Sequence, residues 1–178
     1  MEFKTVRALL FCFMLLFIAG FAEAYEKMVI GVIEKVTFMP EKVTLSAKLD
    51  TGAKSSSLGV TDMKIFEKDH EQWVHFVVHT KSNHFYFERK LEGYVKIKAR
   101  HSENKISESD APHKSYISRP VVLMNIKLGD REEAVYVNLA NRKNFIYPFL
   151  LGRDAIIKLG QIIDPTQKFT LRTKTRTN

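Results

Sequence analysis

Apolar and polar residues alternate with a period of two over much of this chain, which is the pattern of half-buried β-strands. The clearest example is 43–49, where the apolar positions are Val43, Leu45, Ala47 and Leu49. This run stops at Asp50-Thr51-Gly52, a sequence typical of a turn. The pattern therefore predicts a strand with one buried face that ends in a turn carrying a carboxylate.

Other segments extend this β pattern. Strands are predicted at 28–36, at 73–80, at 83–90 and, more weakly, around Tyr94, Ile97 and Ala99. Residues 119–139 predict two strands joined by a hairpin turn at Gly129-Asp130. Only 150–160 has a helical pattern, closed by Gly160. The polar stretch 101–116 predicts a loop, and 172–178 a frayed basic tail. We therefore expect a mostly β fold, closed or partly closed, with one short C-terminal helix.

The first residues are typical of a secretory signal. Lys4 and Arg7 precede an apolar run from Ala8 to Ala22, and Ala22-Glu23-Ala24 has the small residues of a cleavage site. The run is shorter than the roughly 20 residues of a spanning helix. We expect cleavage after Ala24, which leaves 25–178 as a single domain in the periplasm or outside the cell. An N-terminal anchor that is kept is the alternative.

Composition adds two constraints. The only cysteine, Cys12, lies within the signal, so the exported domain has no disulfide and must depend on an ordinary core. The formal net charge is +8 and the pI is about 9.5. For an exported protein this charge favours anionic envelope surfaces over nucleic acid as the partner, although a solvated, highly soluble surface is the better explanation of the charge.

Three kinds of chemistry fit the residues poorly. Gly52-Ala53-Lys54-Ser55 lacks the glycine that precedes the lysine in a phosphate-binding loop. His75 and His79 are four residues apart on a predicted strand, about 13 Å, which is too far for one zinc ion. The serines at 55–57 lack the context of a nucleophile elbow and are better explained by hydrogen bonds to backbone groups. We therefore predict no metal and no cofactor.

Asp50 remains as the candidate for catalysis. A carboxylate at a strand end, followed by Thr51 and Gly52, is the arrangement of an aspartic peptidase. That chemistry needs two carboxylates sharing a proton, so that one acts on water as a base and the other as an acid. The chain has a single such motif. A twofold homodimer would supply the second carboxylate, because a residue on the axis meets its own copy.

The segments "AKLDTGAKSSSL", "RPVV" and "VNLANRKNFIYPFLLGRDAI" resemble a bacterial family that carries the label ATP-dependent zinc protease and has a retropepsin-like structure. The resemblance covers roughly 30–159 and implies a closed β-barrel in which the Asp-Thr-Gly turn and a later Leu-Leu-Gly-Arg segment cross in a ψ-shaped loop. Neither the zinc nor the ATP of that label finds support in these residues.

The resemblance also implies roles for individual residues. Asp50 is the catalytic residue and Thr51, Gly52 and Ala53 are its supporting turn. The segment packed behind them is Leu150, Leu151, Gly152 and Arg153, with Arg153 as a structural ion-pair partner. A flap is expected between the motifs, and we place it at 73–90.

Two functions follow from this interpretation. The first is an exported aspartic endopeptidase that acts on peptides or proteins through a water between two Asp50 carboxylates of a homodimer. The alternative is a catalytically silent retropepsin-like module of the cell envelope that holds an extended peptide in a sheet groove.

Overall fold

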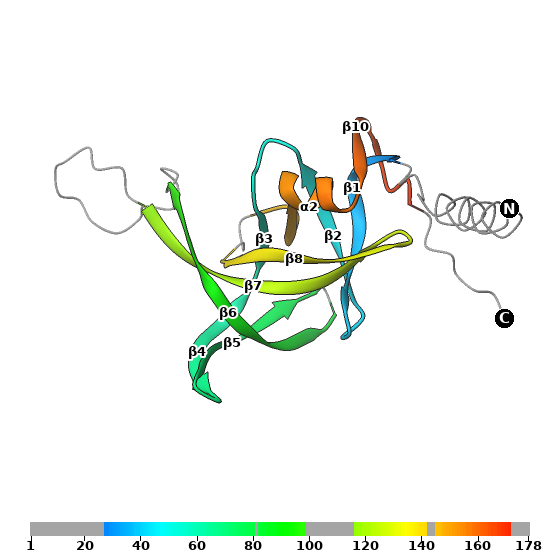
Figure 1. Cartoon of the computed structure of the whole chain (residues 1–178). Coiled ribbons are helices and arrows are strands. Elements are labelled where there is room, and N and C mark those ends of the chain that lie inside the picture. Colours follow the sequence, from blue (N-terminus) through cyan, green and yellow to red (C-terminus); the bar gives the residue numbers. More distant parts are fainter. Residues whose placement is uncertain (1–26, 81, 99–115, 142–144, 172–178) are drawn as a thin grey trace, which may run out of the picture.

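The computed structural model describes residues 27–80, 82–98, 116–141 and 145–171. The expected signal at 1–24, most of the expected loop at 101–116 and the expected tail at 172–178 lie outside these residues. Within these ranges the fold is built mainly from strands, with α2 as the one short helix, as expected (Figure 1). In chain order the elements are β1 Met28–Met39, β2 Val43–Asp50, β3 Ser56–Gly59, β4 Thr61–Lys68, β5 Glu71–His79, β6 His84–Lys98, β7 Tyr116–Leu128, β8 Arg131–Ala140, β9 Phe149–Gly152, α2 Arg153–Lys158 and β10 Gln161–Lys168.

Six strands close into a barrel in the order β1-β2-β9-β3-β8-β7. The closing pair is β1 with β7, which are antiparallel with Thr37 opposite Lys127 and Met39 opposite Asn125. Closure leaves no free strand edge within the barrel and encloses the inward-facing side chains. Closure of the barrel explains the alternation at 43–49, since its apolar residues Val43, Leu45, Ala47 and Leu49 are all buried. The expected retropepsin-like barrel is confirmed.

The C-terminal strand β10 lies outside the barrel, parallel to β1. Here the two backbones approach so closely that a Cβ on Gly31 would lie 2.7 Å from the Gln167 carbonyl oxygen. The residues after β10 are held by the fully buried Glu34. Its carboxylate accepts hydrogen bonds from the backbone N–H groups of Gly31 and Thr170 at 3.0 and 2.8 Å. Glu34 therefore joins the end of the described chain to the first barrel strand.

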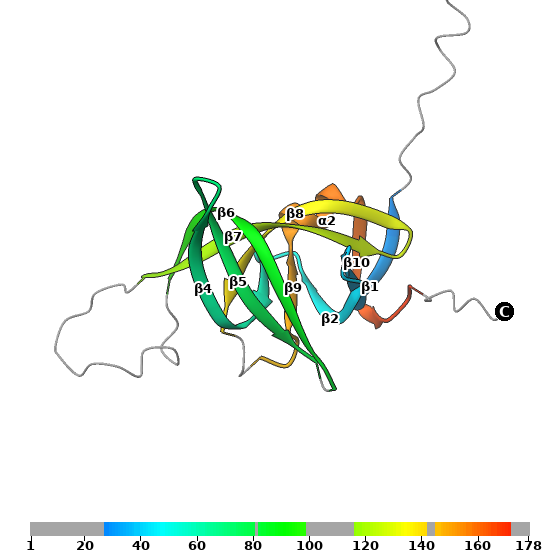
Figure 2. The same cartoon turned by 90° about the horizontal axis from the view of Figure 1, so that it is seen from below.

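A second sheet, β4-β5-β6, extends from the barrel beyond β7 (Figure 2). The long strand β6 belongs to both sheets, since its first half pairs with β5 and its second half with β7. The change occurs at an irregularity between Leu91 and Gly93. Gly93 has a φ of 141°, which a side chain would rarely allow.

Aromatic side chains join the two sheets. Phe38 of β1 packs edge-on against Phe149 of β9 at a centroid distance of 4.9 Å and lies 6.5 Å from Phe87 of β6. Phe87 in turn stacks on Phe76 of β5 at 5.3 Å. The hairpin at 73–90 therefore forms part of the core, and our placement of the flap there was wrong. Its tip lies near the start of β2, whereas Asp50 is at the end of β2.

Several elements differ from the sequence prediction. Strands β3, β4, β9 and β10 were not predicted, and the helix begins at Arg153 instead of 150. Leu150, Leu151 and Gly152 are strand residues because they pair with β2 on one side, and Leu150 also with β3 on the other. Most residues of β4 are exposed on both faces, so it carries no alternating apolar signal.

Candidate active site

The two motifs singled out in the sequence lie side by side. Strand β9 is inserted between β2 and β3, parallel to β2 and antiparallel to β3. In this register Asp50 is opposite Gly152 and Ser57 is opposite Leu150. The chain therefore leaves β2 at Asp50, turns, and returns along the other side of β9. This is the ψ-shaped crossing that the sequence resemblance implied.

Asp50 is presented by a tight turn at the end of β2. Its Oδ1 accepts a hydrogen bond from the Gly52 N–H at 3.1 Å, and the Ala53 N–H bonds to the Asp50 carbonyl at 3.3 Å. The side chain remains 29% exposed, and the Lys48 ammonium lies 3.5 Å from Oδ2. The carboxylate is thus oriented by its own backbone turn while one side stays open to solvent.

Gly152 is required where the turn crosses the second motif. A Cβ on Gly152 would lie 2.5 Å from the Ser55 carbonyl carbon and 2.8 Å from the Lys54 carbonyl oxygen, and both atoms belong to the backbone. The contact continues into α2, where the Arg153 N–H donates to the Ala53 carbonyl at 2.8 Å and the Asp154 N–H to the Lys54 carbonyl at 3.2 Å. The turn that follows Asp50 therefore satisfies the first N–H groups of the helix. Figure 1 shows α2 next to this turn.

A buried polar network supports the same crossing. The Ser56 hydroxyl accepts a hydrogen bond from the Gly152 N–H at 3.1 Å. The Asn138 amide on β8 donates to the Ser56 carbonyl and, at 3.3 Å, to the Ser55 hydroxyl. Arg119 on β7 donates to the Asn138 side-chain oxygen at 3.5 Å. Serine, asparagine and arginine side chains thus fix the position of the turn.

Asn138 and Arg119 were not among the site residues predicted from the sequence. Both lie within segments that carried the family resemblance, "VNLANR" and "RPVV", which was the available signal. The serines were expected to satisfy backbone groups, and Ser56 does so. Asn138 could not be recognised by itself, since a polar residue in an alternating strand normally indicates a solvent-facing position.

The remaining predicted site residues differ in how far they are exposed to solvent. Thr51 is exposed, and its hydroxyl has no hydrogen-bond partner among the residues that the structure describes. Arg153 is exposed as well, and its side chain makes no ion pair within the described ranges, so the expected structural ion pair is not formed there. Leu151 is buried in the core, while Leu150 is half-buried on the face that carries Asp50.

The strand pairing defines the face beside Asp50. Lys48, Leu150, Ser57 and Asn138 occupy one row across β2, β9, β3 and β8. Asp50 is two residues after Lys48 and therefore lies on the same face. Ser57 is only 5% exposed, and its hydroxyl has no partner among the described residues. Only Lys48 and Leu150 of this row reach the surface, because Ser57 and Asn138 are buried, so a substrate lying against Asp50 would meet these two side chains.

Comparison with known proteins agrees with this geometry. Residues 29–174 match the sequence model of the family described as RimB-like, retropepsin-like aspartic endopeptidase RimB. The chain belongs to the RimB-like family. A solved structure with the same fold, a Legionella pneumophila protein of unknown function, is 41% identical, with a TM-score of 0.68 over 83% of this chain and 100% of that one.

Curated relatives of this RimB-like chain have a different name. Two proteins from Shewanella pealeana and Shewanella halifaxensis, each named probable alpha-L-glutamate ligase, are 30% identical over 84% and 82% of this chain. The matched region is 31% and 30% of their own lengths. The chain thus spans about a third of these relatives.

Two observations bear on metals and membranes. Among the described residues, no group of three or more His, Cys, Asp or Glu side chains could hold a metal ion. His75 instead lies beside Glu88, with its Nδ1 3.7 Å from Oε1. Within the same ranges no helix is long and apolar enough to cross a membrane.

Proposed function

We propose that this protein is an aspartic endopeptidase whose active form is a homodimer, with Asp50 and the partner subunit's Asp50 forming the catalytic pair. The observation that carries the proposal is the ψ-shaped crossing, which presents a partly exposed Asp50 carboxylate on a turn held by β9, α2 and Asn138. The family supports aspartic chemistry. The dimer is inferred from the chemistry, because the chain has one Asp-Thr-Gly motif and the reaction needs two carboxylates.

The reaction follows from a shared proton. Two carboxyl groups in contact cannot both be ionised, so one is a carboxylate and the other a carboxylic acid. The carboxylate takes a proton from a water molecule while the water oxygen attacks the scissile carbonyl carbon, and the acid donates its proton to the carbonyl oxygen. Transfer of a proton to the amide nitrogen then breaks the C–N bond and releases a new carboxyl and a new amino terminus.

Acidic peptides are the substrate class we infer. The proposal is supported by the net charge of +8 and by exposed cations around the turn, namely Lys48, Lys54 and Arg153. It is also supported by the relatives' name, since a region related to this chain occurs in proteins named for a reaction of glutamate. We further propose that the protein is exported by residues 1–24 and meets its substrate, and any anionic envelope surface, outside the cytoplasm.

The experiment compares cleavage of quenched fluorescent peptides by the wild type, Asp50→Asn and the control Asp130→Asn. One peptide series contains glutamate and the matched series contains glutamine. We expect Asp50→Asn to abolish cleavage, Asp130→Asn to keep it, and glutamate peptides to be preferred. Sedimentation velocity under the same conditions should show a dimer. Cleavage that survives Asp50→Asn would refute the mechanism, and cleavage by a protein that is monomeric throughout would refute the paired site.

One observation favours the alternative of a silent binding module. In the single chain the ionic partner of Asp50 is Lys48, a pairing that a purely structural aspartate would also make. This function predicts that the wild type and Asp50→Asn bind a glutamate peptide equally well and that neither one cleaves it. The same set of proteins and peptides therefore separates the two functions.

A further inference from the structure

A cavity of about 900 Å³ opens at the end of the barrel opposite to Asp50. It is lined by Thr44 and Ser46 at the start of β2, by Gly59 at the end of β3 and by Pro148 just before β9. Asp50 is four residues beyond Ser46, which corresponds to about 13 Å along a strand. The cavity is therefore separate from the candidate active site.

One wall of the cavity carries a positive charge. The Lys35 ammonium on β1 donates a hydrogen bond to the Ser46 hydroxyl at 2.8 Å and lies 5.5 Å from the centre of the Phe169 ring. No carboxylate among the described residues forms an ion pair with Lys35. The charge is thus held in place by neutral groups at the cavity wall.

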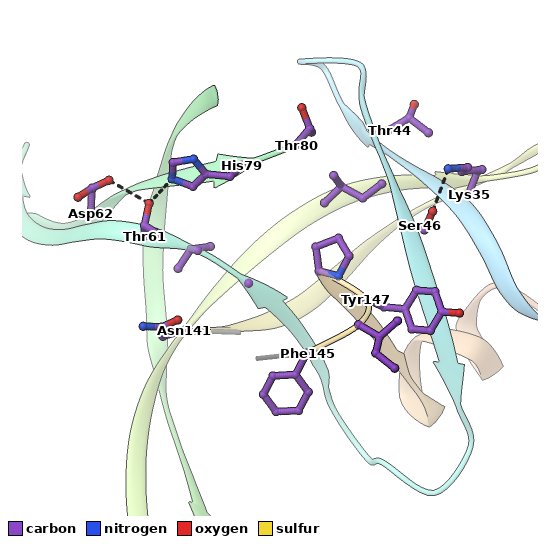
Figure 3. Close-up of a pocket in the computed structure, with 15 residues that line it drawn as sticks. Lys35, Thr44, Ser46, Thr61, Asp62, His79, Thr80, Asn141, Phe145 and Tyr147 are labelled. Carbon is purple, nitrogen blue, oxygen red and sulfur yellow. Dashed lines mark hydrogen bonds between the residues drawn. The ribbon is translucent and has the colours of Figure 1, made fainter. Parts of the chain in front are cut away.

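The opposite wall carries a negative charge. The Asp62 carboxylate accepts a hydrogen bond from the Thr61 hydroxyl at 2.9 Å, and the same hydroxyl lies 2.5 Å from His79 Nε2. Figure 3 shows Asp62, Thr61 and His79 on one side of the pocket and Lys35 with Ser46 on the other. Within the described ranges Asp62 makes no ion pair with a lysine or arginine.

The backbone at Asp62 sets the direction of its carboxylate. Asp62 has a φ of 49°, and the pairing of β4 with β5 is irregular between Thr61 and Lys64. Aspartate is one of the few residues besides glycine that adopt this left-handed conformation, and a bulge changes the direction of a side chain. The irregular backbone therefore accompanies a carboxylate that lines the cavity.

The lining between the two walls is largely apolar. Leu45, Val60 and Pro148 line the cavity, and Ile146 contributes an aliphatic side chain that is 89% exposed. The volume is within the range of roughly 300–1,000 Å³ found for small-molecule sites. The formal charges of Lys35 and Asp62 cancel, so the cavity suits a ligand with separated positive and negative ends better than an anion or a cation.

We propose that this cavity binds a short peptide with free termini. The peptide carboxylate lies against Lys35 and Ser46, its ammonium group against Asp62, and its apolar side chains against Ile146 and Pro148. Charge-assisted hydrogen bonds fix both ends, and burial of the apolar side chains supplies the remaining affinity. This inference does not depend on peptidase activity and assigns a second, non-catalytic site to the protein.

Binding is tested by calorimetry on the full chain carrying Asp50→Asn, which removes the candidate catalytic carboxylate. The probes are peptides of two to five alternating alanine and leucine residues, each in a free, an N-acetylated and a C-amidated form. Lys35→Gln and Asp62→Asn are introduced separately, with Lys64→Gln and Asp130→Asn as exposed controls and circular dichroism as the check of folding.

We expect Lys35→Gln to weaken binding of the free and N-acetylated peptides about tenfold and to leave the C-amidated peptide unchanged. For Asp62→Asn we expect the reverse pattern, with the N-acetylated peptide unchanged. The controls should bind as the parent does. Absence of binding by any peptide at millimolar concentration would overturn the proposal. Equal loss of every form in one variant, or no loss in either, would also overturn it.

Discussion

Substituting the two glycines at the candidate active site should separate stability from function. Gly152→Ala places a methyl group 2.5 Å from the Ser55 carbonyl carbon and 2.6 Å from its oxygen, where only backbone could move aside. Gly52→Ala places one 3.3 Å from Asp50 Oδ1, the end of a side chain that can shift by a few tenths of an ångström. The first change forces two chain segments apart, and the second displaces only the carboxylate.

The magnitude for Gly152→Ala follows from these contacts. The backbone there has φ −83° and ψ 169°, which alanine adopts without strain, so the cost is steric. Overpacking of this kind costs about 1–3 kcal/mol. Separation of the segments also weakens the hydrogen bonds from Arg153 and Asp154 to the turn, at about 1 kcal/mol each. A gain of about 0.5 kcal/mol from the less flexible unfolded chain offsets part of this. The net loss is about 3 kcal/mol.

Urea unfolding followed by tryptophan fluorescence and circular dichroism measures this loss directly. We expect Gly152→Ala to lower the free energy of unfolding by about 3 kcal/mol, and Gly52→Ala to lower it by less than about 1 kcal/mol while reducing peptide cleavage severalfold. A Gly152→Ala protein within about 0.5 kcal/mol of the wild type would show that the crossing is not as tight as the geometry indicates. Full cleavage by Gly52→Ala would show that the carboxylate does not depend on this turn.

Four further substitutions test other features. Glu34→Gln should lower the free energy of unfolding by about 2 kcal/mol in urea titrations, because a buried carboxylate that accepts several N–H groups loses its charge. Asn138→Leu should cost about 2 kcal/mol by the same assay, since the carbonyl it satisfies is left unpaired. Ser57→Ala should leave stability unchanged or raise it by up to about 1 kcal/mol, because the lost hydroxyl has no partner. Hydrogen bonds from Thr166, first from its side chain and then from its backbone, lower the pKa of Asp164 in the folded protein. The Asp164 carboxylate therefore stabilises the fold above the ordinary aspartate pKa of about 3.9. This stabilisation is lost as the pH falls through the lower pKa of the folded state. The difference in stability between the wild type and Asp164→Asn should therefore vanish in acid, and a difference that persists at pH 2 would contradict this.

The strands that could be predicted from the sequence are those in which every second side chain lies on one continuous buried face. The strand at 43–49 was recognised, and it ends at Asp50 as expected, because every second residue packs into the barrel. The hairpin at Gly129-Asp130 was recognised because a glycine lies between two segments of alternating apolar residues. In the structure Gly129 takes a positive φ of 62° in the turn between these two strands. The ψ-shaped crossing came from the family resemblance and not from periodicity.

The elements that were missed depend on partners far away in the chain. Leu150 and Leu151 have a helical pattern, yet they form a strand because β2 and β3 offer hydrogen bonds on both sides. Strand β4 is mostly exposed and exists through pairing with β5. Asn138 supports the site through contacts with residues more than 80 positions earlier, which a local pattern cannot reveal. The flap was misplaced because the apolar strands at 73–80 and 83–90 belong to the core.

The insertion of β9 between β2 and β3 has a consequence for how the protein is made. The hydrogen bond between Ser56 and Gly152 joins residues 96 positions apart, so the turn at Asp50 lacks the support of β9 and α2 until both have been synthesised. Contacts between such distant positions form late and slow the folding of a chain. A nascent chain still attached to the ribosome therefore carries the aspartate without the assembled site. For the endopeptidase proposed above, the catalytic turn is therefore fully supported only after most of the chain has been made.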